Sequence, residues 1–389
     1  MFIPGPVDVS EEVMQAMTQP MIPHRSKEFD ELFRRTAEGM QKVFLTQNRV
    51  FQPPASGSGM QEAAMRNLVA QDVLVLVNGA FADRWYKVGV ANGKSVDRLD
   101  VPWGEAHTPE MLRDALKAKH YEAVAIVHNE TSTGVENPLK ELAAVIHETS
   151  PDTLIMVDAV SSLGGVKIET DAWGLDFVLT SSQKCLALPP GMSFAAVSDR
   201  AMAKAETVPN RGWYFDLLLL EKHRIKDSTP MTPTMQIIYG LDKQLERIFA
   251  EGLENRWARH TAMAQRVQSW MLAHDMPALA KPEYCSKTVS TIQNTREIDI
   301  SALNKFLLTK GMRIANGYGD LKNKTFRIAT MGDTTMDDVN QLLDAFEEYL
   351  KIAWTTVDAQ EPGVHWKASR LFNGVILAEK VRIRIDKLV

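Results

Sequence analysis

The sequence has few cysteines and no long apolar run. Only Cys185 and Cys285 occur in 389 residues, which excludes a disulfide framework and a structural zinc site built from closely spaced thiols. The N-terminal segment lacks the charged and then apolar order of an export signal, and no apolar stretch is long enough to span a bilayer. We therefore expect a cytoplasmic protein that is not inserted in a membrane.

A strong excess of one charge is also missing. Lys and Arg together number 44, Asp and Glu together number 49, and the formal net charge is -5. This balance gives no reason to expect nucleic acid or an anionic membrane as a partner. Small-molecule chemistry is therefore the favoured class of function. The length allows two domains, or one large domain with a smaller companion.

The first half of the chain alternates helix-like stretches with short β-branched runs. Such alternation is typical of βαβ units and a largely parallel sheet, so we expect a doubly wound α/β domain. Pro109 and Pro138 stand where a first helical turn tolerates proline. The predicted strands are Asp72–Val77, Ala123–His128, Thr153–Val157 and Phe177–Thr180, and the predicted helices include Pro109–Lys119 and Leu139–Thr149.

The second half begins with one long helical pattern from about Met235 to Ala273. Two strand-like segments, TVSTIQ and TFRIAT, then alternate with two helical ones, which indicates a small α+β domain. The predicted division is an N-terminal arm at 1–15, a large domain at 16–255, a small domain at 256–355 and a tail of unknown role at 356–389. The end of the tail, KVRIRIDKLV, alternates charged and apolar residues and can form an edge strand.

A Ser-Gly segment, Ser56–Met60 (SGSGM), precedes a helix-like stretch. Glycines let the backbone approach an anion, and the free amides at a helix N-terminus donate to it. The segment matches neither the dinucleotide-binding glycine pattern nor the P-loop pattern. A phosphate cradle and a plain turn into a helix are therefore both consistent with it.

Two other side chains follow predicted strands, where ligands of open α/β sheets bind. Phe81 comes just after Asp72–Val77, and its ring can stack on a flat ligand or simply pack in the core. Asp158 comes directly after the predicted strand Thr153–Val157, where a desolvated carboxylate needs a cationic partner. A helix N-cap is the alternative for Asp158.

Lys184 lies in TSSQKCLALPPG, between a strand-like run and a Pro-Pro-Gly turn. A lysine in a loop is usually a solvated surface charge. At a constricted strand end it can instead be desolvated, which lowers its pKa so that the neutral amine attacks a carbonyl. A phosphate cradle, an aromatic face, a buried carboxylate and an amine are together what pyridoxal 5'-phosphate requires.

The chain resembles the class V aminotransferases of fold type I, in particular the alanine-glyoxylate, serine-glyoxylate and serine-pyruvate branch. The resemblance runs from PGPVDVS at the N-terminus to about residue 330. It is carried by HNETSTG, VDAVSSLGG, SSQK followed by LPPG, TPTMQIIYGL, EGLENRWARH and FRIATMG. It implies a large domain with a mostly parallel, seven-stranded sheet, a small α+β C-terminal domain, and pyridoxal 5'-phosphate as the cofactor.

The resemblance also implies roles for single residues. Lys184 corresponds to the lysine that forms the Schiff base, Asp158 to the carboxylate that pairs with the pyridine nitrogen, and Phe81 to the ring-stacking position. Phe81 departs from the family, because relatives often have tryptophan there. The positions that match the phosphate cup are Ser58, Gly59, Met60 and Gln183.

Further positions concern the substrate and the partner subunit. Thr131 corresponds to a residue beside the ring and substrate, and Thr232 to one that reaches the phosphate from the neighbouring subunit, which implies a homodimer. Arg327 would hold the substrate carboxylate through two parallel hydrogen bonds. Gly5 is expected on the substrate side as well. No metal is expected.

The predicted activity is a ping-pong transamination from alanine or serine to glyoxylate or pyruvate. Phosphoserine or aspartate as donor is an alternative, which would need another cation such as Arg25 or His24. A lyase of the cysteine desulfurase type is a second alternative, although neither Cys185 nor Cys285 is well placed to take sulfur. A non-enzymatic binding protein is a third, which would not need the Asp158 and Lys184 pair.

Overall fold

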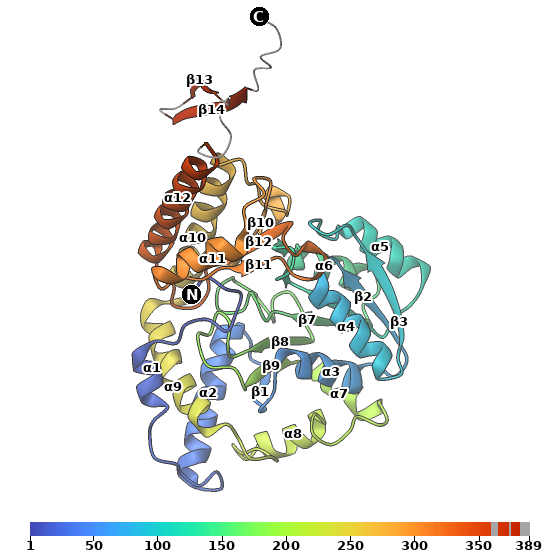
Figure 1. Ribbon diagram of the computed structural model, residues 1–389. Coiled ribbons are helices and arrows are strands. Elements are labelled where there is room, and N and C mark those ends of the chain that lie inside the picture. Colours follow the sequence, from blue (N-terminus) through green and yellow to red (C-terminus); the bar gives the residue numbers. More distant parts are fainter. Residues whose placement is uncertain (359–364, 373–374, 382–389) are drawn as a thin grey trace, which may run out of the picture. The chain divides into compact units, whose positions relative to one another are not determined.

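The computed structural model describes residues 1–358, 365–372 and 375–381 (Figure 1). The chain forms two compact units, Met1–Val339 and Asn340–Val389. The helix α12 (Met336–Asp358) begins in the first unit and continues into the second. The domain boundaries expected at residues 15, 255 and 355 stay predictions. Among the described residues, no helix is long and apolar enough to cross a membrane.

The first unit contains a seven-stranded sheet, which confirms the predicted α/β class. Only β9 runs against its two neighbours, and the remaining pairs are parallel. Across the sheet the strands are β1 (Arg49–Phe51), β9 (Ser193–Val197), β8 (Phe177–Ser181), β7 (Leu154–Asp158), β4 (Ala123–Val127), β2 (Asp72–Val77) and β3 (Ser95–Asp100). The four predicted strands agree with β2, β4, β7 and β8 within one residue at each end.

Helices cover both faces of this sheet because its strands are apolar on both sides. In β2, Leu74 and Leu76 belong to one buried cluster, whereas Val73, Val75 and Val77 belong to the other. The first cluster includes residues of α2 (Lys27–Phe44), α5 (Pro109–Ala118), α6 (Leu139–Thr149) and α9 (Met235–Glu251). The second includes residues of α3 (Gly57–Leu68), α4 (Ala80–Ala91), α7 (Asp199–Thr207) and α8 (Leu217–Arg224). A parallel sheet buried on both faces reads as a continuous apolar run, and DVLVLV is such a run.

The ends of the helices around the large sheet could partly be predicted from the sequence. Two predicted helices agree closely with the structure, since α6 matches at both ends and α5 matches at its start and ends one residue earlier. The helices are α1 (Glu11–Ala16), α2 (Lys27–Phe44), α3 (Gly57–Leu68), α4 (Ala80–Ala91), α5 (Pro109–Ala118), α6 (Leu139–Thr149), α7 (Asp199–Thr207) and α8 (Leu217–Arg224).

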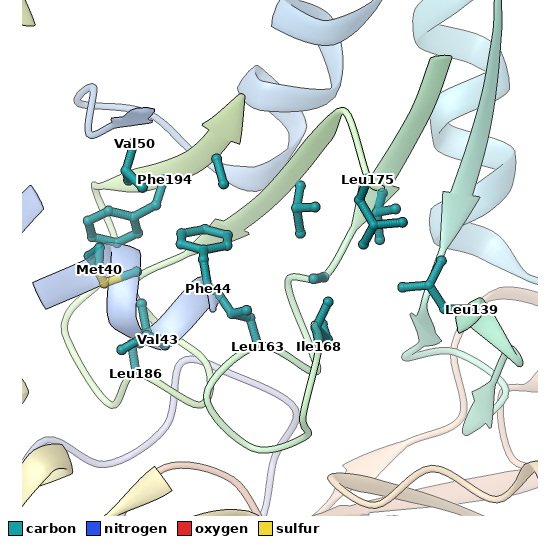
Figure 2. Packing of buried hydrophobic residues seen from close by; sticks show 14 of the residues in the cluster. Met40, Val43, Phe44, Val50, Leu139, Leu163, Ile168, Leu175, Leu186 and Phe194 are labelled. Atoms are coloured by element: carbon teal, nitrogen blue, oxygen red, sulfur yellow. The ribbon is translucent and has the colours of Figure 1, made fainter. Parts of the chain in front are cut away.

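The segment after β8 is anchored in the first cluster. Leu186, two residues beyond Lys184, belongs to it together with Met40 and Phe44 of α2 (Figure 2). Leu186 is fully buried. Apolar packing therefore fixes the loop that carries the lysine.

A smaller α+β part follows, as the sequence predicts. Its three-stranded antiparallel sheet has the order β10, β12, β11. The helix α11 (Ile300–Thr309) lies between β10 and β11 along the chain. The strands are β10 (Val289–Gln293), β11 (Ala315–Asn316) and β12 (Thr325–Ala329). The N-terminus joins this part, because Phe2 forms a bridge with Ile314 and accepts a hydrogen bond from the Ala329 amide at 2.9 Å.

The single long helix expected over 235–273 is wrong. The structure has two helices, α9 (Met235–Glu251) and α10 (Leu253–Ala273), which meet at Gly252. Gly252 has φ 83° and ψ 137°, a conformation that only glycine adopts without strain. The apolar spacing continues through the break, so periodicity alone did not reveal it.

The end of the chain contains a hairpin of β13 (His365–Phe372) and β14 (Val375–Val381). The strand expected in KVRIRIDKLV falls only in its first two residues within β14. Residues 382–389 lie outside the described residues.

Replacing Gly252 by alanine tests the helix junction. Apart from the two chain neighbours, Asn255 Nδ2 at 3.5 Å is the only atom of the described residues within 4 Å of an added Cβ, so backbone strain is the dominant cost. We expect the free energy of unfolding to fall by about 1 to 3 kcal/mol, measured by urea denaturation. Glu254→Ala, at an exposed position two residues away, is the control and should change it by less than about 0.5 kcal/mol. Equal values for the two variants would contradict the strain argument.

Candidate active site

Four neighbouring strands end at one edge of the large sheet, and each is followed by a candidate functional residue. Phe81 follows β2, Thr131 follows β4, Asp158 ends β7 and Lys184 follows β8. The carboxyl ends of parallel strands lie together, so the sheet brings these four distant parts of the chain to one place.

A cavity of about 480 Å³ lies at this edge. Its wall also includes the N-terminal arm and residues from the small sheet. Of the predicted site residues, those that line it are Gly5, Ser58, Phe81, Thr131, Asp158, Gln183, Lys184 and Arg327.

Three predicted residues do not line this cavity. Met60 is fully buried in the core, and its amide donates to Ser56 O within the helix. Gly59 lies against Phe215, where an added Cβ would approach the ring to 2.9 Å. Thr232 is exposed on the segment before α9.

Lys184 is buried, with 9% of its surface exposed, and its Nζ donates to Pro4 O. Burial, and to a smaller extent the positive charge of Arg327, lower the pKa of its amine to about 8. Gly5 packs directly on this side chain, since an added Cβ would lie 2.8 Å from Lys184 Cδ. At pH 7 about a tenth of the amine is then in the neutral form that attacks an aldehyde, far more than at the ordinary lysine pKa of 10.5.

The Pro-Pro-Gly turn beyond Lys184 is tied back to the same loop. Ser182 Oγ donates to Pro189 O at 2.6 Å, and the Leu188 amide donates to Ser182 O at 3.1 Å. The Ala187 amide closes a tighter turn on Lys184 O at 2.8 Å. These bonds hold the lysine at a fixed point of the cavity wall.

Asp158 is buried and accepts two hydrogen bonds. Gln61 Nε2 donates to Oδ2 at 2.7 Å, and the Val160 amide donates to Oδ1 at 2.9 Å. Burial nevertheless raises the pKa of the carboxyl to about 6. The carboxylate at the floor of the cavity thus favours a cationic partner such as a protonated ring nitrogen.

Phe81 lies in the first turn of α4 and shares a wall with two side chains that the sequence analysis missed. The Tyr318 ring centroid is 5.4 Å from that of Phe81, and Arg84 Cζ lies 4.8 Å from the Phe81 centroid. Arg84 also donates to Ser58 Oγ at 3.2 Å and to the Tyr318 hydroxyl at 3.3 Å. Arg84 was visible in the sequence as the residue one helical turn after Phe81, whereas Tyr318 lies in a loop without a pattern.

Glu130 positions the start of α4. Its carboxylate accepts hydrogen bonds from the amides of Phe81 at 3.1 Å and Ala82 at 2.9 Å, and from the Ser132 hydroxyl at 2.6 Å. Burial raises the pKa of this carboxyl. The positive end of the α4 dipole offsets part of the cost of burying this carboxylate. Glu130 therefore fixes the start of α4 and with it the position of the Phe81 ring. Within the HNETSTG motif, only Thr131 was predicted as a site residue.

Arg327 is carried by β12 and faces the cavity with 9% of its surface exposed. Its Nε donates to Asn316 O at 3.0 Å, and its Cζ lies 5.5 Å from the Tyr318 ring centroid. Among the described residues, no carboxylate lies within ion-pair distance of Arg327 or of Arg84. Two guanidinium groups therefore remain available for anionic groups of a ligand.

The cavity fits pyridoxal 5'-phosphate. Three side chains on its wall, Gln61, Asn129 and Ser181, each have a buried oxygen without a hydrogen-bond partner among the described residues. An added Cβ at Gly57 would meet Val160 Cγ2 at 2.6 Å, so the backbone at the start of α3 lines a narrow cradle. Helix amides, a ring-stacking wall, a carboxylate and an amine match the phosphate, ring, nitrogen and aldehyde of the cofactor.

Comparison with known proteins agrees with this geometry. The family model described as aminotransferase class-V matches residues 11–342. The chain belongs to the class V aminotransferases. It is therefore a pyridoxal phosphate-dependent aminotransferase, as the sequence analysis expected.

Relatives cover most of the chain. The L-aspartate–glyoxylate aminotransferase of Paracoccus denitrificans is 34% identical over 342 residues, which are 86% of each chain. The serine–glyoxylate aminotransferase of Methylorubrum extorquens is 33% identical over 346 residues, again 86% of each chain. The crystal structure of alanine–glyoxylate aminotransferase from Nostoc sp. has a TM-score of 0.84 at 31% identity and covers 90% of this chain and 94% of that one.

The pH dependence of cofactor capture tests the state of Lys184. We expect the rate at which the cofactor-free protein gains visible absorbance with pyridoxal phosphate to rise with pH through about 8, because the neutral amine reacts. Arg327→Gln should move this midpoint upward, since the charge of Arg327 lowers the amine pKa. Arg25→Gln, at an exposed position, should leave it in place. A wild-type midpoint near the ordinary lysine value of 10.5 would show that the amine is not desolvated.

Proposed function

We propose that this class V aminotransferase transfers the amino group of alanine or serine to glyoxylate or pyruvate. The observation that carries the proposal is the cavity itself, in which Lys184, Asp158 and Arg327 surround one small space. Glyoxylate as acceptor is supported by the names of five relatives between 30% and 34% identical.

The residues of the cavity account for the chemistry. Pyridoxal phosphate, when bound, supplies an aldehyde for the amino group and a ring that withdraws electrons from it. Lys184 holds the aldehyde and, once released, moves the proton from the donor Cα. Asp158 would keep the pyridine nitrogen of the bound cofactor protonated. Arg327 binds the donor α-carboxylate and so orients the Cα–H bond toward the lysine.

The cofactor phosphate is assigned to the start of α3. Gly57 and Ser58 are the first helical residues there, and the first amides of a helix have no acceptor inside it. Ser58 and Gln183 both line the cavity. We assign Thr131, whose hydroxyl is bonded to Ser161 Oγ at 2.6 Å, to the side of the ring.

Aspartate is a second candidate donor. A side-chain carboxylate needs another cation, and Arg84 lies on the cavity wall without a carboxylate partner among the described residues. The other cations considered do not line the cavity within one subunit. Arg25 donates to Ser228 Oγ at 3.0 Å and to Thr229 O on the outer surface, and His24 is its neighbour.

The cysteines give little support to a lyase of the desulfurase type. Cys185 is fully buried, and burial raises the pKa of its thiol to about 11. Burial also raises the pKa of Cys285 to about 11. Both thiols are protonated near neutral pH and are poor nucleophiles. Their free state fits a cytoplasmic location, which is part of the proposal.

A homodimer with shared sites completes the proposal. Thr232 does not reach the cavity of its own subunit and is exposed. Trp213, 62% exposed, and Tyr214, 41% exposed, precede Phe215, which contacts Gly59 at the start of α3. An exposed aromatic surface beside the phosphate cradle suits a partner subunit.

A donor and acceptor panel tests the activity. We expect alanine or serine with glyoxylate to give the highest kcat/KM, and Lys184→Ala to abolish both transamination and the visible absorbance of the bound cofactor. Cys185→Ala, at the adjacent position, should retain both. If aspartate is a donor, Arg84→Gln should lower kcat/KM for aspartate by about 1 to 3 kcal/mol in transition-state binding, with less effect on alanine. Sulfide release from cysteine without an oxo acid would favour the lyase instead.

Mixing two inactive variants tests the shared site. Lys184→Ala removes the amine, and Thr232→Glu places a negative charge where the phosphate of the partner's cofactor would bind. We expect activity to return when the two variants are mixed and allowed to exchange subunits, because one site of each mixed dimer is intact. Unmixed samples are the control. A sedimentation mass equal to the chain mass of 43.5 kDa would contradict the dimer.

A further inference from the structure

A buried arginine lies directly behind the turn that carries Lys184. Arg256, in the first turn of α10, is 1% exposed. Its Nη2 donates to the backbone oxygen of Cys185 at 2.8 Å. Cys185 is the residue after Lys184, so a charged side chain from another helix holds the backbone one residue from the amine.

Two carboxylates hold the Arg256 guanidinium in place. Glu251 Oε2 accepts from Nη1 at 2.8 Å, and Asp333 Oδ1 accepts from Nη1 and Nη2 at 3.2 Å each. Glu251 ends α9, and Asp333 lies in the loop after β12. A buried guanidinium is stable only with such partners, and here they come from two further segments of the chain.

The loop that contains Asp333 also contacts the lysine turn. Gly332, with φ 67°, packs on Ala187, because an added Cβ would lie 2.9 Å from Ala187 Cβ. Met331 and Cys185 share a small buried cluster with Val7 and Ala187. Met331 lies only two residues after Ala329, the last residue of β12, and β12 carries Arg327. Arg256 therefore ties the backbone beside Lys184 to the segment that follows Arg327.

We propose that Arg256 is a positioning residue that sets the location of Lys184 relative to Arg327. The inference rests on the proposed roles of these two residues, which must meet the same donor molecule. Arg327 fixes the donor carboxylate and Lys184 removes the proton from the adjacent Cα. A shift of the lysine backbone against β12 lengthens that proton transfer, to which rates are sensitive.

The alternative is that Arg256 only stabilises the junction of α9 and α10, and Arg259 is the matched control. Arg259 lies on the same helix and pairs with the same Glu251, at 2.6 Å and 3.0 Å. Its other donors end on the backbone oxygens of Gly332 and Thr334 rather than on Cys185. Both arginines belong to the ion network, and Arg256 is the one that reaches the lysine turn.

The experiment compares Arg256→Gln and Arg259→Gln as cofactor-loaded enzymes. For each variant, kcat and KM are measured with alanine and with 2-deuterated alanine, together with urea stability and the pH midpoint of the visible absorbance. We expect Arg256→Gln to lower kcat by up to about 100-fold with little change in KM, and to raise the isotope effect on kcat. Arg259→Gln should lose comparable stability but keep the wild-type isotope effect and absorbance midpoint.

Arg256→Lys covers the case in which Arg256→Gln does not fold. Lysine retains the charge between Glu251 and Asp333 but lacks the planar fork that also reaches Cys185 O. It should restore stability and leave kcat low with a raised isotope effect. A wild-type kcat and isotope effect in Arg256→Lys would overturn the proposal, as would equal kcat losses and unchanged isotope effects in the two glutamine variants. If the wild-type enzyme showed no transamination at all, the proposed function itself would be refuted instead.

Discussion

Desolvation of Lys184 is the constraint on which the site depends. An amine that stays protonated cannot attack an aldehyde at neutral pH, and the protein lowers its pKa mainly by burial rather than by a charged partner. Burial in turn requires walls around the side chain. Pro4 and Gly5 of the N-terminal arm, the turn that Ala187 closes and β12 with Arg327 provide those walls. The N-terminal arm and β12 are remote from Lys184 in sequence, and both are needed to enclose its amine.

The same low-polarity surroundings set the states of the neighbouring acids. Asp158 and Glu130 are both buried, and burial raises the pKa of each. Their hydrogen bonds differ in purpose. Glu130 is satisfied by amides and a hydroxyl of the protein and serves the backbone of α4. Asp158 accepts from Gln61 and Val160 and still faces the cavity, where a cationic ligand atom can compensate its charge.

The parts of the fold that could be predicted are those with a local signal. β2 and β4 are uninterrupted apolar runs bounded by turns, and their limits were found within one residue. β3 was missed because its burial alternates irregularly and its sequence, SVDRLD, is mostly polar. The division between α9 and α10 was missed because one glycine interrupts the backbone without interrupting the apolar spacing.

The site divides in the same way. Lys184, Asp158 and Phe81 follow strands, so their placement at one edge could be inferred from the order of elements. Gln61, Arg84 and Arg256 act through contacts with residues far away in sequence, which no periodicity encodes. Met60 matches the phosphate-cup motif at the start of α3, but its side chain is buried in the core. A motif match therefore did not predict where this side chain points. Local patterns place the backbone, whereas side-chain partners require the tertiary structure.

The hydrogen bond from Lys184 to Pro4 O joins residues 180 positions apart. The bridge between Phe2 and Ile314 joins residues that are separated by most of the chain. Contacts of such long range close large loops and form late in folding, after the local βαβ units. The sheet can therefore be complete before the amine is enclosed. Competence to take up the cofactor should be among the last properties that the folding chain acquires, which makes uptake a reporter of fully folded molecules.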